Sequence, residues 1–305
     1  MIRTPSRLTL FRLTHHRAVL VMVAVAFLWS TAGVVTRHLE VAKSFEVTFW
    51  RSFATVLCLL VILPLFKGRG VFARMAHASK TFWASGLCWA CMFTFYMLAI
   101  TLTTVANVLV TLAIGPLVTA LFARLFIGQR LPAHTWMAIV AAGCGIAWMF
   151  GAQVLGGDAS GNTVLGILIA LVVPLAGGAN WTLTQRAHAK GMDVDLMPAV
   201  LVGAALSSLA MLPMAWPLKA TPHDIYLLSG LGFYQLAVPC TLAVWCAGVL
   251  KAPEVSLLAL LEVPFGIALV WLGANEAPDA AVLSGGALVI GALVANEYIG
   301  WRKRS

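Results

Sequence analysis

The sequence predicts an all-α membrane protein with ten transmembrane helices arranged as two inverted five-helix repeats. Three observations predict this class: an apolar composition, ten long apolar runs, and matches between the two halves of the chain. Of the 305 residues, 61% are hydrophobic and only 10% are charged, whereas a soluble domain carries about 25% charged residues. The mean hydropathy is +0.93. So much apolar surface cannot be hidden in one core, and we expect it to face lipid.

The apolar runs are each long enough to cross a bilayer, which takes about 20 helical residues. They are 18–36, 46–66, 82–100, 105–126, 133–150, 164–184, 198–217, 229–250, 254–272 and 281–299. The break at 101–104 leaves room only for a tight turn. A single helix across 82–126 would extend about 67 Å, more than twice the thickness of the hydrocarbon core, so the chain must reverse there.

The placement of basic residues orients these spans. With the N-terminus in the cytoplasm, the outer segments hold only Arg37, Lys43 and Lys219, Arg51 lies within a span, and the rest of the 20 Lys and Arg residues fall on the cytoplasmic side. This asymmetry follows the positive-inside rule. The run 18–36 is too long for the core of a signal peptide and predicts an uncleaved first span. We expect a bacterial-type plasma (inner) membrane protein with both termini cytoplasmic.

Composition and motifs disfavour other functional classes. The net charge is +9, but the basic residues lie between apolar runs and form no cluster for nucleic acid. Cys88 and Cys91 have no second pair, so we expect no metal and no cofactor. The sequence lacks GxxxxGK[ST], HExxH and GxSxG, so we expect no ATPase subunit, no catalytic residues and no enzyme. The partners left are the bilayer and a small-molecule solute, and a homodimer is compatible with the sequence.

The two halves of the chain match at a nearly constant offset. Leu63-Pro64 corresponds to Leu212-Pro213, and Pro116 corresponds to Pro264. Because each half has an odd number of spans, the second half enters from the opposite side of the membrane. Inverted repeats of this kind are a common build for secondary transporters.

These matches divide the chain into five predicted segments. They are a cytoplasmic N-terminal segment (1–17), a first repeat (18–150), an external Gly-rich linker loop (151–163), a second repeat (164–299) and a basic cytoplasmic tail (300–305).

Several motifs, in order along the chain, carry a family resemblance. Phe27-Leu28-Trp29-Ser30 is similar to a Leu-Trp-Gly opening, with Ser in place of Gly, and Phe49-Trp50-Arg51-Ser52-Phe53 is similar to an Arg-Phe element. The chain over 18–298 thereby resembles the EamA-type permeases of the drug/metabolite transporter superfamily. The other matching residues are Ala106, Pro116, Gln129 and Gly143 in the first copy, and Glu262, Val263, Pro264, Gly273, Glu276, Gly286 and Gly291 in the second.

The resemblance implies two EamA repeats of five helices, a central cavity, and usually export of amino acids, other metabolites or drugs. It does not fix the substrate. The sequence departs from the family at Gln129, where the first copy often has an acidic residue; the second copy keeps Glu276. We interpret this position as a loop cap and not as a coupling site.

Glu262 is the strongest candidate for a site, because polar groups within spans are costly and seldom face lipid. It falls near the middle of the run 254–272, where a charged carboxylate costs about 3 kcal/mol on insertion scales. Either it binds and releases a proton as the site opens, which proton coupling requires, or it only ties helices together. Pro264 nearby frees a backbone carbonyl that either binds solute or simply marks a kink.

Arg51 is the second candidate. It lies about five residues below the outer end of the run 46–66, roughly 7–8 Å deep. Its side chain either snorkels to the outer interface, or faces a cavity and binds a solute carboxylate or pairs with Glu262. The corresponding residue of the second half is apolar Val200.

The remaining candidates bind solute in one interpretation and pack or bond helices in the other. They are Trp29, Tyr96, Asn107, Asn180, Trp181 and Gln235. Together these features favour a secondary transporter that exports amino-acid-like or other amphipathic solutes, or drugs, and is driven either by protons through Glu262 or by the solute gradient. The alternatives are an uptake permease of the same fold and a non-transport membrane scaffold.

Overall fold

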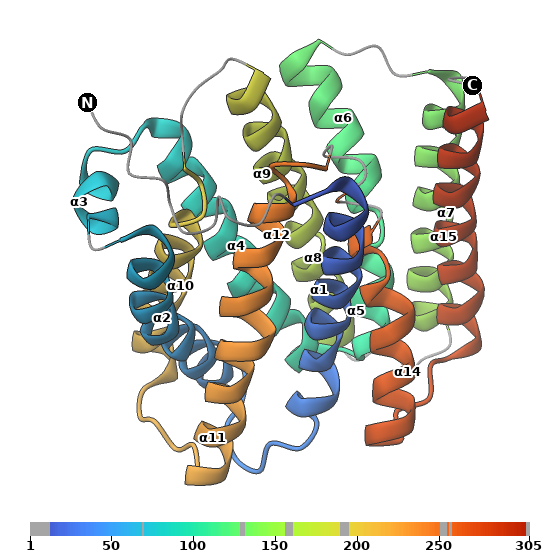
Figure 1. Cartoon of the computed structure of the whole chain (residues 1–305). Helices are drawn as coiled ribbons and strands as arrows, with labels where there is room; N and C mark the ends of the chain where they lie inside the picture. Colours follow the sequence, from blue (N-terminus) through green and yellow to red (C-terminus); the bar gives the residue numbers. More distant parts are fainter. Residues whose placement is uncertain are drawn as a thin grey trace.

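The computed structural model describes residues 13–68, 70–128, 132–155, 161–189, 195–250, 255 and 258–302, and these form helices, turns and loops without a strand. Figure 1 shows the helices running side by side in one bundle. Their bounds are α1 (His15–Thr36), α2 (Phe45–Lys67), α3 (Val71–Ala76), α4 (Lys80–Leu102), α5 (Val105–Leu112), α6 (Gly115–Ile127), α7 (Ala133–Leu155), α8 (Gly161–Ala170), α9 (Val172–Ala189), α10 (Ala199–Ala215), α11 (Pro222–Gly230), the π-helix η2 (Leu231–Ala237), α12 (Val238–Cys246), α14 (Glu262–Ala274) and α15 (Ala280–Arg302).

The helices are apolar on the outside of the bundle as well as inside it. Six helical stretches of the described chain are long and apolar enough to cross a membrane: His15–Thr36, Phe45–Lys67, Lys80–Leu102, Val105–Ile127, Asn162–Ala187 and Pro222–Cys246. Four shorter apolar helices accompany them: Ala133–Trp148, Ala199–Ala215, Glu262–Ala274 and Ala280–Asn296. Leu272 is 84% exposed and Leu65 is 70% exposed, a surface that lipid solvates and water does not. The all-α integral membrane class is confirmed.

The predicted reversal near residue 101 is present. Helix α4 ends at Leu102 and α5 begins at Val105. The Thr104 hydroxyl accepts a hydrogen bond from the Asn107 backbone N–H at 3.3 Å, so it caps the new helix. The second short break, at 251–253, lies outside the described residues.

Several predicted runs are interrupted where a continuous helix was expected. The run 105–126 is divided into α5 and α6, and the run 164–184 into α8 and α9. The run 229–250 contains the π-helix η2. In the run 254–272, helix α14 begins only at Glu262, so this residue lies in a first helical turn and not within a continuous helix. Hydropathy reports where apolar residues lie and carries no signal for such breaks.

The interruptions before α6 and α14 are alike. Both helices have 13 residues and carry a proline in the first turn, Pro116 and Pro264. Proline fits the first turn because it has no N–H to donate there. Both helices end at a residue in the left-handed conformation, Gly128 with φ 75° and Asn275 with φ 53°.

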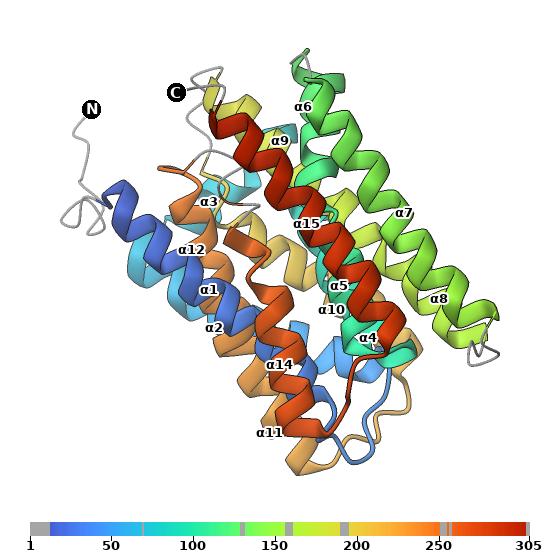
Figure 2. The same cartoon turned by 90° about the vertical axis from the view of Figure 1, so that its right-hand side faces the viewer.

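Helices from distant parts of the sequence pack closely. Helix α10 packs against α2 and α4, α1 packs against α14, and α7 packs against α15, the last pair lying side by side in Figures 1 and 2. At Gly203 of α10 the approach to α4 is tight, since a Cβ atom there would lie 2.3 Å from Trp89 Cβ and 3.0 Å from the Ala90 backbone nitrogen.

Gly203→Ala is therefore expected to destabilise the protein. The added methyl group must displace helix backbone, and overpacking of this kind costs about 1–3 kcal/mol. The measurement is the thermal unfolding midpoint of purified protein in detergent. Gly143→Ala in α7 is the matched control, because a Cβ atom there meets nothing within 4 Å. Equal midpoints for the two variants would contradict the packing described for α4 and α10.

Candidate functional site

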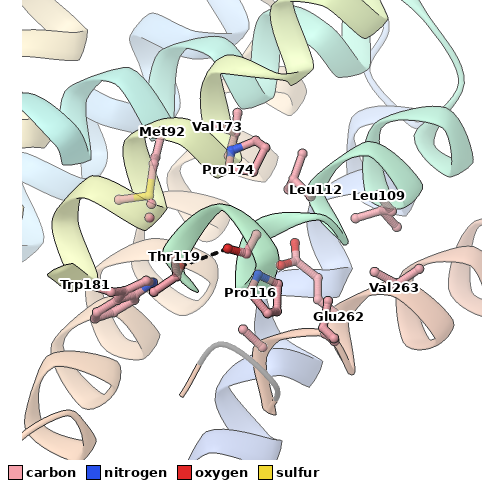
Figure 3. A pocket seen from close by; sticks show the side chains of 15 residues that line it. Met92, Leu109, Leu112, Pro116, Thr119, Val173, Pro174, Trp181, Glu262 and Val263 are labelled. Atoms are coloured by element: carbon pink, nitrogen blue, oxygen red, sulfur yellow. Dashed lines mark hydrogen bonds between the residues drawn. The ribbon is translucent and has the colours of Figure 1, made fainter. Parts of the chain in front are cut away.

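A cavity of ≈ 120 Å³ lies inside the bundle, where α4, α5, α6 and α9 meet the start of α14. Figure 3 shows its lining side chains. The lining combines both halves of the chain. It consists of Met92, Leu109, Leu112, Gly115, Pro116, Thr119, Val173, Pro174, Gly177, Gly178, Trp181, Ala259, Leu260, Glu262 and Val263.

Both matching helix breaks border this cavity. Leu112 and Gly115 flank the break between α5 and α6, and Leu260 and Glu262 flank the start of α14. Within a membrane, irregular backbone is tolerated only where protein or a cavity covers it. The cavity therefore lies where helix breaks from the two halves of the chain meet.

Glu262 is the ionisable residue of the lining. Figure 3 shows its carboxyl group pointing into the cavity between Pro116 and Leu112. The Tyr96 hydroxyl donates a hydrogen bond to Glu262 Oε1 at 3.2 Å. Glu262 opens α14, and the next two backbone N–H groups, those of Val263 and Phe265, already donate to the carbonyls of Leu260 and Leu261 at 3.0 and 3.3 Å. The structure thus places a single carboxyl group in an otherwise apolar cavity.

Arg51 does not line the cavity. Its guanidinium group donates to the Phe93 carbonyl at 2.7 Å and to Gln235 Oε1 at 3.1 Å. It also lies 5.9 Å from the centre of the Tyr96 ring. The residue is only 1% exposed, so the interpretation in which its side chain snorkels to the interface is wrong. Arg51 and Glu262 are linked through Tyr96, and among the described residues they form no direct ion pair.

Gln235 anchors this arginine from the π-helix η2. Besides accepting from Arg51, its side-chain amide donates to the Trp29 carbonyl of α1 at 3.3 Å. The wider turn of a π-helix changes which side chains face the neighbouring helices, and such segments are frequent at functional sites. Close approach is possible because Gly232 lacks a Cβ, which would lie 2.7 Å from the Arg51 carbonyl oxygen. Arg51, Gln235 and Trp29 therefore join α1, α2 and η2.

The other predicted residues divide between the cavity and the packed interior. Trp181 lines the cavity. Asn180 accepts a hydrogen bond from the Ser85 hydroxyl at 2.6 Å, and the Asn107 amide donates to the Thr103 hydroxyl at 2.9 Å, so both buried amides bond protein groups. Trp29 contributes its carbonyl to Gln235, and its side chain packs at the edge of the hydrophobic core.

Sequence reasoning missed several wall residues of the cavity. Met92, Thr119 and Pro174 line it, and the sequence does not single them out, because such residues are common in apolar spans. The signal that could have found the site was the pairing of Pro116 with Pro264 between the halves, since interrupted helices at corresponding positions mark binding sites in repeat transporters.

Glu276 acts at one end of the bundle as a loop cap, as expected for this position; Gln129, its counterpart, lies outside the described residues. Glu276 Oε1 accepts from the Val105 backbone N–H at 2.8 Å, and Oε2 accepts from Arg37 Nε. The same arginine donates to the carbonyls of Ile100 and Thr103, each at 3.1 Å. These bonds tie the ends of α1 and α14 to the turn between α4 and α5.

Two further carboxylates join the halves at this same end. Asp224 of α11 accepts from the backbone N–H groups of residues 40, 41 and 42 at 2.8, 3.0 and 2.8 Å. Glu46 of α2 accepts from the backbone N–H groups of residues 219 and 220 at 2.8 and 2.7 Å. We call Glu46, Asp224, Glu276 and Arg37 the carboxylate clasp. Asp224 also lies close to Glu40 and His223, a combination that could hold a metal ion. Its carboxylate already accepts three backbone N–H groups, and these bonds account for its burial.

Comparison with known proteins supports the family resemblance. Residues 16–151 match the model of the EamA-like transporter family. The chain is 24% identical over 281 residues to the pseudopaline exporter CntI of Pseudomonas aeruginosa (strain UCBPP-PA14), an alignment that covers 91% of this chain and 94% of that protein. A solved crystal structure superposes with a TM-score of 0.59 at 19% identity, covering 95% of this chain and 99% of the other, and so shares its fold. The resemblance to EamA-type permeases is confirmed, and the chain is a small-molecule transporter and not an enzyme.

The bonds around Arg51 give a test of the buried charge. Gln235→Leu is expected to lower the thermal unfolding midpoint strongly, because it leaves a buried guanidinium N–H without its acceptor, a loss of about 2 kcal/mol or more. The double variant Arg51→Met/Gln235→Leu is expected to recover much of this loss, since it removes both the charge and its partner. The measurement is again thermal unfolding in detergent. A double variant no more stable than Gln235→Leu would contradict this account of the site.

Proposed function

Because residues 16–151 belong to the EamA-like transporter family, we propose that the chain is a secondary exporter of small metabolites. Its solutes are amino-acid-like or otherwise amphipathic compounds, or drugs. It is built from two inverted five-helix repeats in a bacterial-type inner membrane, and it is coupled to protons through Glu262. The observation that carries the proposal is the Glu262 carboxylate in an apolar cavity, at the meeting point of two matching helix breaks.

Corresponding helices of the two halves make corresponding contacts, and this supports the inverted repeats. Helix α1 packs against α14 and α12, as α9 packs against α6 and α4, while α2 packs against α10 and α7 against α15. The family match ends at residue 151, next to the end of the proposed first repeat, 18–150. On this proposal 151–163 is the external linker and 164–299 is the second repeat.

The proposed orientation puts both termini, with segments 1–17 and 300–305, in the cytoplasm. In Figure 1 the start of α1 and the end of α15 lie at the same end of the bundle. The opposite end carries the carboxylate clasp, which includes Arg37, and the backbone of Lys219 bonds to it. The positive-inside rule then makes the clasp end the outer one.

The clasp and the cavity together support an inward-facing conformation. The clasp joins α1 and α14 at the turn before α5, and the cavity begins beyond it, at Leu109, and continues along α6. The two halves rock about the cavity during transport, so the clasp must open before solute can leave on the outer side. Export is also the direction named for the Pseudomonas aeruginosa relative.

Proton coupling requires a carboxyl group that titrates as the site changes its exposure. Glu262 meets the geometric requirement, because it lines the cavity and has Tyr96 as a hydrogen-bond donor that can separate from it when the halves move. A scaffold would have no use for such a group in its interior. Uptake would use the same site in the opposite direction, so only flux distinguishes it from export.

The first experiment compares metabolites in medium and cytosol of cells that overexpress the wild type or Glu262→Gln. With the wild type, we expect a few solutes to be enriched in the medium. In Glu262→Gln, whose side chain keeps the shape but loses the charge, we expect this enrichment to fall at least about tenfold. Asp279→Asn is the control, since Asp279 is an exposed carboxylate at the start of α15. Solutes depleted from the medium would instead establish uptake, and no change in either compartment would sink transport of an endogenous solute.

Weakening the clasp should favour the outward-facing conformation. Glu276→Gln removes the ion pair with Arg37 but keeps an oxygen that can accept from the Val105 N–H. We expect faster labelling of a single cysteine at position 112 by an impermeant thiol reagent added outside cells, in a background without the native cysteines. An unchanged rate in Glu276→Gln would show that the pair does not close the outer side.

A further inference from the structure

The cavity has the chemistry to select among amphipathic solutes. We infer that it takes a solute with a cationic amine head and a compact apolar body, an inference that rests on the proposed transport function. Glu262 binds the head, and the wall residues around Trp181 and Met92 enclose the body.

The residues that line the cavity favour a positively charged head group on the solute. Apart from Glu262, the side chains around the cavity are apolar or, at Thr119, a hydroxyl that donates to the Gly115 carbonyl at 2.8 Å. In such surroundings, where water is scarce, charges interact far more strongly than in water. An ammonium group next to the carboxylate is stabilised, whereas a solute carboxylate at the same place is repelled.

Glu262 has acceptor capacity left for this head. A carboxylate offers two oxygens with about four acceptor positions. Tyr96 donates to Oε1, and Oε2 accepts no hydrogen bond from the described part of the chain. Hydrogen bonds between an ammonium group and a carboxylate are about twice as strong as those between neutral groups.

The positive charge of Arg51 does not reverse this preference. Arg51 is absent from the lining, its side chain donates to Phe93 and Gln235, and its guanidinium carbon lies 5.9 Å from the centre of the Tyr96 ring. A solute carboxylate in the cavity therefore meets Glu262, which lines it, and not Arg51, whose donors are bonded to protein groups outside the lining.

The size of the cavity restricts the apolar body. At ≈ 120 Å³ it is slightly smaller than a cavity of about 150 Å³ that binds benzene. A single ring or a short alkyl chain fits when a flexible wall residue such as Met92 moves. Three solutes that share one ring and differ only in the head group therefore test the inference.

The test measures binding of 2-phenylethylamine, 2-phenylethanol and 3-phenylpropanoate to the purified full-length protein in nanodiscs, by titration calorimetry at neutral pH. We expect the amine to bind at least about tenfold more tightly than the alcohol, and the carboxylate most weakly. This preference should disappear in Glu262→Gln and persist in Asp279→Asn. The elution profile in size-exclusion chromatography verifies that each variant is folded.

Three results would overturn the inference: equal affinity for amine and carboxylate, a preference that persists in Glu262→Gln, or no binding of the amine to the wild type. Each of these is separable from the proposed function. If cells still export solutes in a Glu262-dependent way, the transport function stands and only the solute class is wrong. If the wild type exports nothing, the transport function itself fails.

Discussion

A helix that breaks inside a membrane leaves backbone N–H and C=O groups that lipid cannot satisfy, and this constraint organises the whole structure. The breaks before α6 and α14 must therefore face protein or a cavity. Both breaks border the same cavity, which Glu262 also lines, although they come from different halves of the chain. The cavity and its carboxylate thus lie beside the two helix breaks, where the halves of the chain meet.

Two opposite charges are buried in this arrangement without contacting each other. Arg51 is held by the Phe93 carbonyl and the Gln235 amide, and Glu262 accepts from the Tyr96 hydroxyl. Burying two charges costs more than a surface pair, and directly joined partners would neutralise each other. Kept apart, Glu262 retains an oxygen for the proton and the ammonium group that we propose it binds in turn. The separation thus keeps the carboxylate available to a ligand while the arginine holds helices together.

The sequence predicted the class of the protein well because lipid imposes simple rules. Long apolar runs and the tight turn after Leu102 were readable from hydropathy and length, and Glu262 was chosen because a carboxylate in a span is costly. The placement of Arg51 was not readable, since one sequence does not show that the Phe93 carbonyl and Gln235 converge on it. Likewise, the buried amides of Asn107 and Asn180 look the same in sequence whether they contact solute or, as here, Thr103 and Ser85.

The central claim is that the cavity beside Glu262 is a transport site open in turn to each side of the membrane. Its most direct test is the reactivity of a single cysteine in Thr119→Cys, at the cavity wall, in a background without native cysteines. Impermeant thiol reagents are added to right-side-out and to inside-out vesicles. The account predicts labelling from both sides, faster from the cytoplasmic side. Labelling from neither side would show that the cavity is a packing void, and the account would then be wrong.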